Sequence, residues 1–166
     1  LGVVRGLDEP EADRLAAEIV AEQRRRGRAV RVLAGKVHLH PGSLAENVAG
    51  FDPRVSASKV TDALLSAGLG PLLKRQTTGV TAPVREDRPI GDPDEDARLE
   101  VATVLLDPPT LVVARRGLGA LPTEEANALL DRLRGTGAAV LVLDPRVEVG
   151  NHATEIAVRP RGEVPS

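Results

Sequence analysis

Residues 110–114 read TLVVA and residues 139–144 read AVLVLD, and these two apolar runs decide the fold. Neither run alternates apolar with polar residues, which is typical of strands buried on both faces of a sheet. A helix that buries one apolar face is predicted between them, over residues 122–134. Its inward residues are Ala126, Leu129, Leu130 and Leu133. Strand, helix and strand in this order predict a parallel pair joined by a right-handed crossover.

The same alternation of strands and helices extends toward both ends of the chain. Further strands are predicted at residues 1–4, 29–33 and 155–159. Helices are predicted at 9–26, 56–67 and 92–107, with a short helical turn at 44–48. The residues expected to cap them are Asp8, Ser43, Ser56 and Asp92. We therefore predict one α/β domain over residues 1–166, in which helices cover both faces of a mainly parallel sheet.

Local composition predicts the structure of two further segments. Residues 75–92 contain glycines and prolines among charges, so we expect a surface loop there. The helix that follows is expected to bury a single face. That face carries Ala97, Val101, Val104 and Leu105.

Composition excludes several classes of function. The chain has 22 Lys and Arg against 24 Asp and Glu, and Phe51 is its only aromatic residue. A nucleic-acid module is therefore not expected, because such modules need a basic surface and aromatic rings for stacking. The absence of Cys removes disulfides and thiolate zinc sites. Since the sequence begins at Leu1 without Met, we interpret it as a piece of a longer polypeptide.

Chemistry in parallel α/β sheets is found where the strands end at their carboxyl side. In this sequence that edge is expected to gather Arg5–Asp13, Arg115–Gly119 and Asp144–Val149. Arg115 and Arg116 are the basic pair of most interest there. They could bind an anion or an acidic partner side chain, although a plain surface pair is an equal alternative.

Several segments, in order, resemble the nucleotide-binding domain of an ABC transporter of the exporter type. HPGSLAENVAGFDP at 40–53 is similar to the family's FSGTIRENI followed by a D-P pair, and ALLSAGLGPLL at 63–73 to its AAxxAGLxxfI helix. The other similar segments are VATVLLDPPTLVV at 101–113, AAVLVLD at 138–144 and ATEIAVRPRGEV at 153–164. The resemblance implies a P-loop NTPase-like sheet, transmembrane export, and a place at the cytoplasmic face of the membrane.

The residues that bind phosphate in that family are replaced in this chain. A P-loop reads G-x-x-x-x-G-K-[ST], because bare backbone N–H groups, a Lys and a hydroxyl hold the phosphates and Mg²⁺. Gly6 matches the first glycine, but Glu11, Ala12 and Asp13 stand at the other three positions. Asp8 and Glu9 add to the acidic charge of this turn. We therefore expect neither ATP nor Mg²⁺ as a cofactor.

The family's remaining working positions are also substituted. Ala114 stands where the family has the Asp that organises Mg²⁺, and Arg115 where it has the Glu that polarises water. Gly35 replaces the Gln of the coupling loop, and Asp144 replaces the switch His. The signature LSGGQ aligns with Ile90, Gly91, Asp92, Pro93 and Asp94. The resemblance thus implies a catalytically degenerate domain with a structural or regulatory role.

The resemblance also implies partners and a reduced antiparallel subdomain. A transmembrane domain is expected to meet the stretch at Leu39, His40 and Pro41, and a second nucleotide-binding domain to complete the assembly. Leu44 and Val48 follow in the sequence, and for these two residues core packing is as good an explanation as contact with a partner. Residues 27–36 leave little room for the family's antiparallel subdomain, which is expected to be reduced.

The sequence leaves two other functions open. One is an active ABC ATPase whose site residues are displaced, with Asp107 or Asp144 as the acidic candidate and ATP and Mg²⁺ as cofactors. The other is a small-molecule or metal-binding α/β module. His38 and His40 lie on one side of an extended segment, and with His152 or a carboxylate they are weak candidates for zinc. The basic run at 24–28 is interpreted as a solvated helix end.

Overall fold

Five parallel strands form the main sheet of the computed structural model, which describes residues 1–85, 92–150 and 153–155. The strand order is β2-β5-β6-β1-β7, and each adjacent pair is parallel. The strands are β1 (Gly2–Val3), β2 (Val30–Ala34), β5 (Leu111–Arg116), β6 (Ala139–Val142) and β7 (Thr154–Glu155). The predicted α/β class is confirmed. The last predicted strand begins at β7, and its residues 156–159 lie outside the described residues.

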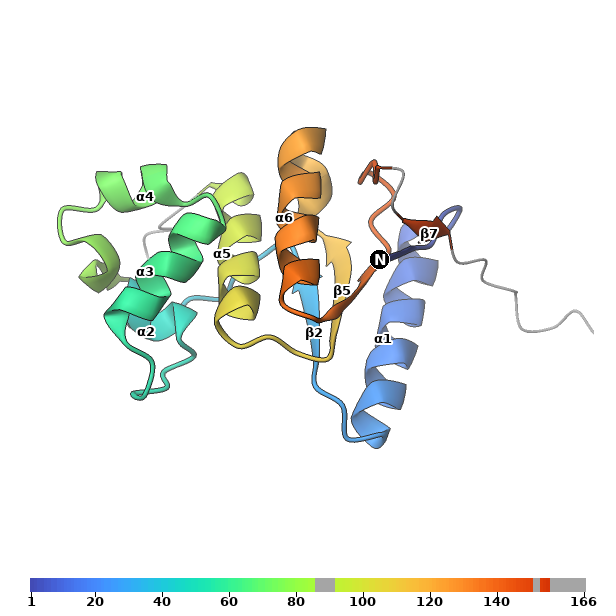
Figure 1. Ribbon diagram of the computed structural model, residues 1–166, viewed down its shortest axis with the longest axis horizontal. Helices are drawn as coiled ribbons and strands as arrows, with labels where there is room; N and C mark the ends of the chain where they lie inside the picture. The colour runs from blue at the N-terminus through green and yellow to red at the C-terminus, as the bar shows by residue number, and fades with distance from the viewer. Residues whose placement is uncertain (86–91, 151–152, 156–166) are drawn as a thin grey trace, which may run out of the picture.

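Helices cover both faces of this sheet (Figure 1). The helices that contact the strands of this sheet are α1 (Glu9–Arg25), α5 (Pro93–Leu106) and α6 (Thr123–Gly135). The other helices are α2 (Leu44–Val48), α3 (Ala57–Ser66) and α4 (Gly70–Arg75), with 3-10 turns η1 (Gly79–Thr81) and η2 (Leu118–Ala120). Ala12 and Ala16 of α1 pack with Val113 on one face. Val112 and Ala114 point to the larger core on the other face. Because β5 is buried on both sides, its apolar run does not alternate.

Side-chain caps set the beginnings of four helices where the sequence predicts them. Asp8, Ser43 and Asp92 each form a reciprocal capping box with the Glu three residues later. Ser56 accepts a hydrogen bond from the backbone N–H of Lys59 at the beginning of α3. These local interactions explain why the helix beginnings can be read from sequence alone.

The stretch at 75–92 corrects the expectation of a simple surface loop. It contains η1 and the strand β4 (Pro83–Val84), which pairs antiparallel with β3 (Gly42–Ser43). Ala82 and Val84 are buried in the core, so this part of the stretch packs under α2 rather than lying on the surface. Residues 86–91 lie outside the described residues. The small sheet accounts for an antiparallel element, although residues 27–36 contribute no strand to it.

Helix α5 lies at the centre of the helical layer and differs from the prediction of a single buried face. It packs against α3 on one side and against β2 and α6 on others. Leu99 and Ala102 are fully buried in addition to the predicted Ala97, Val101 and Val104, whereas Leu105 is only half-buried. Helix α4, which follows a three-residue break after α3, is a short element that the sequence did not predict separately.

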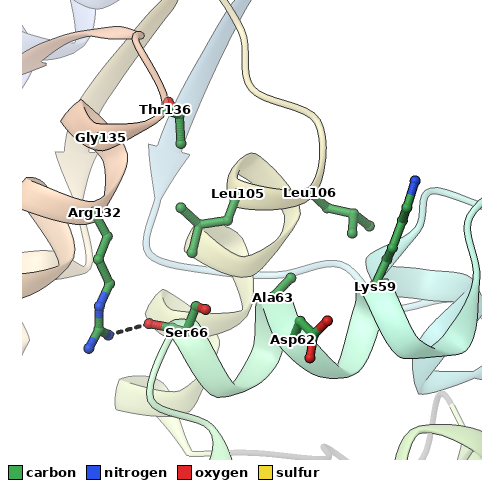
Figure 2. Close-up of a pocket in the computed structure, with 9 residues that line it drawn as sticks. All are labelled: Lys59, Asp62, Ala63, Ser66, Leu105, Leu106, Arg132, Gly135 and Thr136. Carbon is green, nitrogen blue, oxygen red and sulfur yellow. Dashed lines mark hydrogen bonds between the residues drawn. The ribbon is translucent and has the colours of Figure 1, made fainter.

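A cavity of about 670 Å³ lies between the C-terminal ends of α5 and α6 and the length of α3. Figure 2 shows Leu105 and Leu106 at its centre, with Lys59 on one side and Arg132 on the other, where Arg132 donates to the carbonyl oxygen of Ser66. Both α5 and α6 lead from here into the amino ends of strands. The cavity therefore lies at the sheet edge opposite to the carboxyl ends.

No helix within the described ranges is both long and apolar enough to cross a bilayer.

Candidate functional site

The carboxyl ends of β1, β5 and β6 meet at one edge of the sheet. Val142 of β6 pairs with Val3 on one side and with Ala114 on the other, so the loops that follow the three strands are neighbours. This arrangement brings together the segments that the sequence predicts to meet, at residues 5–13, 115–119 and 144–149. The candidate site is therefore built on three adjacent strand ends and on the beginning of α1.

The beginning of α1 is closed by the protein's own carboxylates. Asp8 Oδ1 accepts the backbone N–H of Glu11 at 2.8 Å, and Glu11 Oε2 accepts the N–H of Asp8 at 3.0 Å. Gly6, at φ 76°, supplies the left-handed turn before the cap. An open helix N-terminus binds anions through its unpaired N–H groups. Here part of that capacity is already used, and by negatively charged groups.

Arg115 is buried at the centre of the site and is not a surface residue. Its guanidinium donates from Nε to Asp13 Oδ1 at 2.8 Å and from Nη2 to the backbone carbonyl oxygen of Glu9 at 2.7 Å. The side chain of Arg115 is 4% exposed, whereas Asp13 is 55% exposed. The alternative of a surface basic pair is wrong for Arg115, because α1 covers it and supplies its partners.

Arg116 extends the same network toward solvent. Its Nη2 lies 3.1 Å from Asp13 Oδ2 and 3.4 Å from Glu9 Oε2. Asp13 thus bridges two guanidinium groups at the end of β5, and two of the four acidic side chains in this turn are neutralised internally. Half of the acidic side chains of the turn are thus paired with cations that lie about a hundred positions later in the chain.

These residues do not fit a nucleotide and its magnesium ion. Ala12 offers no ammonium group, and Asp13, which would have to supply a hydroxyl to the metal, is bound by two arginines instead. Ala114 is fully buried in β5 and presents only a methyl group. Arg115 carries a permanent positive charge and cannot take a proton from water.

Asp144, which the sequence resemblance aligns with the family's switch His, is buried and held by several hydrogen bonds. It accepts from the backbone N–H groups of Gly119 and Arg146, and from the Arg146 guanidinium at 3.1 and 3.3 Å. The paired Asp144 carboxylate raises the pKa of Arg146. A Cβ on Gly119 would lie 2.9 Å from both Asp144 oxygens, so the glycine is required for this approach. Asp144 therefore fastens the loop after β6 to η2.

Glu100 of α5 is a polar residue of the site that the sequence reading missed. Its two carboxylate oxygens accept the backbone N–H groups of Ala34 at 3.0 Å and Gly35 at 2.7 Å, at the end of β2. Burial raises the pKa of Glu100 to about 7, against the opposing effect of these hydrogen bonds. No motif marks Glu100, and the sequence shows only that it is the last charged residue of α5, directly before the mainly apolar residues 101–106.

Gly35, aligned with the coupling-loop Gln, crosses the backbone of Gly117. A Cβ on Gly35 would lie 2.8 Å from the Cα of Gly117, and one on Gly117 would lie 2.6 Å from the Cα of Gly35. Both residues have left-handed φ, of 76° and 94°. Main chain therefore contacts main chain at this point, and no side chain reaches from position 35 into the site.

The positions aligned with the signature serve as the beginning of α5. Asp92 caps the helix, Pro93 is its first residue, and Asp94 adds a carboxylate to the first turn, as the sequence predicts. Arg75 of α4 pairs with Glu95 in the same turn at 2.5 Å. Ile90 and Gly91 lie outside the described residues.

The predicted partner segment lies on the surface beside Phe51, the only Phe, Tyr or Trp residue of the chain. Asn47 ties it to α2, because its side chain accepts the N–H of His40 at 2.7 Å and donates to the His40 carbonyl oxygen at 2.9 Å. The His40 ring meets Phe51 edge-on, with centroids 6.3 Å apart. Phe51 is 48% exposed and has φ 59°. Leu39 is half-buried and Pro41 is exposed, so His40, Pro41 and Phe51 form one exposed group, which we call the α2 face.

The histidine candidates for metal do not gather. Within residues 1–85, 92–150 and 153–155, no three His, Asp or Glu side chains are placed to hold one ion. His38 and His40 are both exposed, and His152 lies outside the described residues.

Comparison with known proteins shows what the sequence and the fold of the chain are similar to. No protein-family model matches the chain. Over 130 residues it is 25% identical to the "Probable multidrug resistance ABC transporter ATP-binding/permease protein YheH" of Bacillus subtilis (strain 168). The chain is related to the ABC transporters. The alignment covers 76% of the chain but 19% of the Bacillus protein, so the chain spans about a fifth of the length of this curated relative.

The fold of this ABC transporter-related domain agrees with that relationship. It superposes with a TM-score of 0.58 on the structure of a bacterial Atm1-family ABC exporter with ATP bound, at 19% sequence identity. The match covers 69% of this chain and 20% of the exporter. At this level of identity the likeness concerns the fold alone, and the chemistry of the site depends on the residues present here.

Proposed function

We propose that the chain is the nucleotide-binding-type domain of an ABC exporter in which the nucleotide site has been replaced by internal ion pairs. The observation that carries the proposal is the buried Arg115, which binds Asp13 and the carbonyl oxygen of Glu9 where the related family holds phosphate and metal. A domain whose nucleotide site is occupied by its own ion pairs acts as a structural or regulatory component and does not hydrolyse ATP.

The partners proposed for this domain follow from the same relationship. They are a transmembrane domain, which docks on the α2 face and Leu39, and a second nucleotide-binding domain that supplies any catalysis. Through them the domain would be held at the cytoplasmic face of the membrane. Two features favour a docking role for the α2 face. One is the half-exposed Phe51 ring in a left-handed backbone conformation, and the other is the paired hydrogen bonds between Asn47 and His40.

An active ATPase with displaced residues is the second candidate, and the geometry disfavours it. Asp144 is 1% exposed and is held by Gly119 and Arg146, so it is not free to meet a substrate. Asp107 is 88% exposed, but it follows α5 at the amino side of β5, away from Gly6 and Asp13. A metal or small-molecule module centred on His38 and His40 is the third, and it lacks a further ligand among the described residues.

The experiment that separates the first two candidates is a measurement of phosphate release with ATP and Mg²⁺. We expect the protein to release no phosphate above the buffer background, because arginines hold Asp13 and Asp144 and because Ala114 has no group that could bind a metal. Asp107→Ala and Asp144→Ala serve as matched variants and should give the same background. Mg²⁺-dependent release that disappears in either variant would establish the active-ATPase alternative instead.

A further inference from the structure

Strand β2 lies at the edge of the main sheet, with β5 on one side and no described strand on the other. The carbonyl oxygen of Ala29, just before β2, accepts the N–H of Leu111 in β5. Alternate residues of a parallel strand bond to the neighbouring strand, so Val30 and Val32 direct their N–H and C=O groups away from β5. These outward groups form no hydrogen bond with another described residue. The edge of β2 is therefore open to the addition of a further strand.

A groove of about 370 Å³ lies between β2 and helix α1 on the α1 face of the sheet. Ala17 and Val20 of α1 and Val32 and Ala34 of β2 are among the residues that line it. Val32 is 38% exposed, although it lies within a strand. The side chains of a strand added beside β2 would therefore find an apolar surface on this face.

One polar atom beside this groove lacks an acceptor. Arg116 lines the groove, and its Nε is buried without a hydrogen-bond partner among the described residues. Its Nη2 is occupied by Asp13 and Glu9 at 3.1 and 3.4 Å. The register places Arg116 beside Ala34, at the carboxyl end of β2. Since buried donors are nearly always paired, a carbonyl or carboxylate oxygen of a bound partner fits at this end of the edge.

Cations lie along the same edge. Arg28 precedes β2, Arg31 lies within it, and Lys36 follows it. The Arg31 guanidinium is 4.0 Å from the Asp107 carboxylate, which is 88% exposed. Arg28 and Lys36 form no ion pair with a described carboxylate. The edge therefore favours an added strand that carries acidic residues.

The same cations disfavour a second copy of this chain as the added strand. Two-fold antiparallel pairing centred on Val32 would set Arg28 opposite Lys36 of the other copy at both ends. Pairing centred on Arg31 would set that residue opposite itself. Like charges directly opposite one another destabilise a sheet, and native proteins use edge cations to prevent such pairing. Residues 156–166 of the chain do not supply acidic charge either, because they carry two arginines and one glutamate.

We propose that the open edge of β2 binds an acidic extended segment of a partner protein, which adds to the sheet as a further strand. Its backbone bonds to the outward groups of Val30 and Val32, and its apolar centre packs over Val32 in the groove. Its acidic residues meet Arg28 at one end and Lys36 at the other, where an oxygen also accepts from Arg116 Nε. The proposal goes beyond the proposed function and holds whether or not the domain binds nucleotide.

A synthetic peptide tests this edge in the whole chain. The probe has the sequence Glu-Glu-Val-Thr-Val-Glu-Glu, with blocked ends and a fluorescein label, and binding is followed by fluorescence anisotropy. We expect saturable binding that weakens as the salt is raised from about 0.05 to about 0.5 M. The same peptide with Lys in place of Glu should not bind. In ¹⁵N-labelled protein, the amide signals of Val30 and Val32 should shift on addition of the acidic peptide.

Substitutions at the edge separate strand pairing from general charge attraction. Val32→Pro removes an outward N–H but no bond to β5, so peptide binding should weaken by about tenfold or more. Val32→Thr is the matched control, because it keeps the β-branched shape and the N–H, and it should bind within about twofold of the native chain. Arg28→Glu combined with Lys36→Glu should also weaken binding by about tenfold, whereas Arg134→Glu on α6 should not.

Several results would overturn the proposal. They are equal binding of the acidic and basic peptides, no saturable binding at millimolar peptide, and unchanged binding to Val32→Pro. If Val32→Pro does not fold, the charge variants and the amide signals decide. A native chain that sediments as a dimer, together with a monomeric Val32→Pro, would assign the edge to a second copy and would also overturn the proposal.

Discussion

Arg115→Glu is expected to lower the free energy of unfolding by about 3 kcal/mol or more. The substitution restores the residue type that the resembled family has at this position. In this chain, however, it places a carboxylate in a site that is 4% exposed, beside Asp13 and the carbonyl oxygen of Glu9. Breaking a buried pair in this way typically costs about 3–5 kcal/mol, and the exposed side of Asp13 reduces the repulsion. No phosphate release should appear in the variant.

The pairing is tested by reversing both charges. Asp13→Arg combined with Arg115→Glu should recover at least about 1 kcal/mol of the loss, because opposite charges meet again across α1 and β5. Arg134→Glu is the matched control, since its partner Asp131 is an exposed neighbour on α6, and about 0.5 kcal/mol is expected there. The chain has no Trp or Tyr, so unfolding in urea is followed by far-ultraviolet circular dichroism. Equal losses at Arg115 and Arg134 would contradict a buried ion pair.

Gly117→Ala is expected to cost about 3–5 kcal/mol, a large part of the roughly 5–15 kcal/mol that stabilises a typical domain. Two effects add. The residue has φ 94°, which an L side chain rarely adopts, and its Cβ would lie 2.6 Å from the Cα of Gly35. The neighbour is backbone and cannot turn away, so the ends of β2 and β5 would have to separate. Urea unfolding of the variant measures the loss.

Two other glycines separate backbone strain from steric contact. Gly137 has φ 86° but a Cβ there would meet nothing within 4 Å, so Gly137→Ala should cost only about 1–2 kcal/mol. Gly135 ends α6 with ordinary φ and free space, and Gly135→Ala should stabilise by about 0.5 kcal/mol. If Gly117→Ala costs no more than Gly137→Ala, the close crossing of Gly35 and Gly117 is not a constraint on the fold.

The parts of the fold that depend on local interactions could be predicted from the sequence. Asp8, Ser43 and Asp92 cap helices through residues only three positions away, and the strands at 110–114 and 139–144 are continuous apolar runs. The small sheet could not be predicted, because its two-residue strands β3 and β4 pair across about forty positions. Neither strand is long enough to carry a pattern.

The candidate site, like the fold, could be predicted from the sequence only in part. Sequence alone indicated which segments meet at the strand ends and that the phosphate-binding residues are substituted. It did not indicate that Arg115 is buried and paired with Asp13, because the partners are 102 positions apart and charged residues are usually exposed. Glu100 was missed for a related reason: its partners are the backbone N–H groups of Ala34 and Gly35, and backbone donors leave no trace in a sequence.

Calorimetric titration with nucleotide tests the central claim most directly. ATP and ADP are titrated at millimolar concentration, with Mg²⁺ present, into the folded protein. The account predicts no saturable heat for either nucleotide, because Arg115 is already bound by Asp13 and Glu9 and because Ala12 and Ala114 offer nothing to phosphate or metal. Saturable binding of ATP or ADP at a ratio near one nucleotide per chain would contradict it.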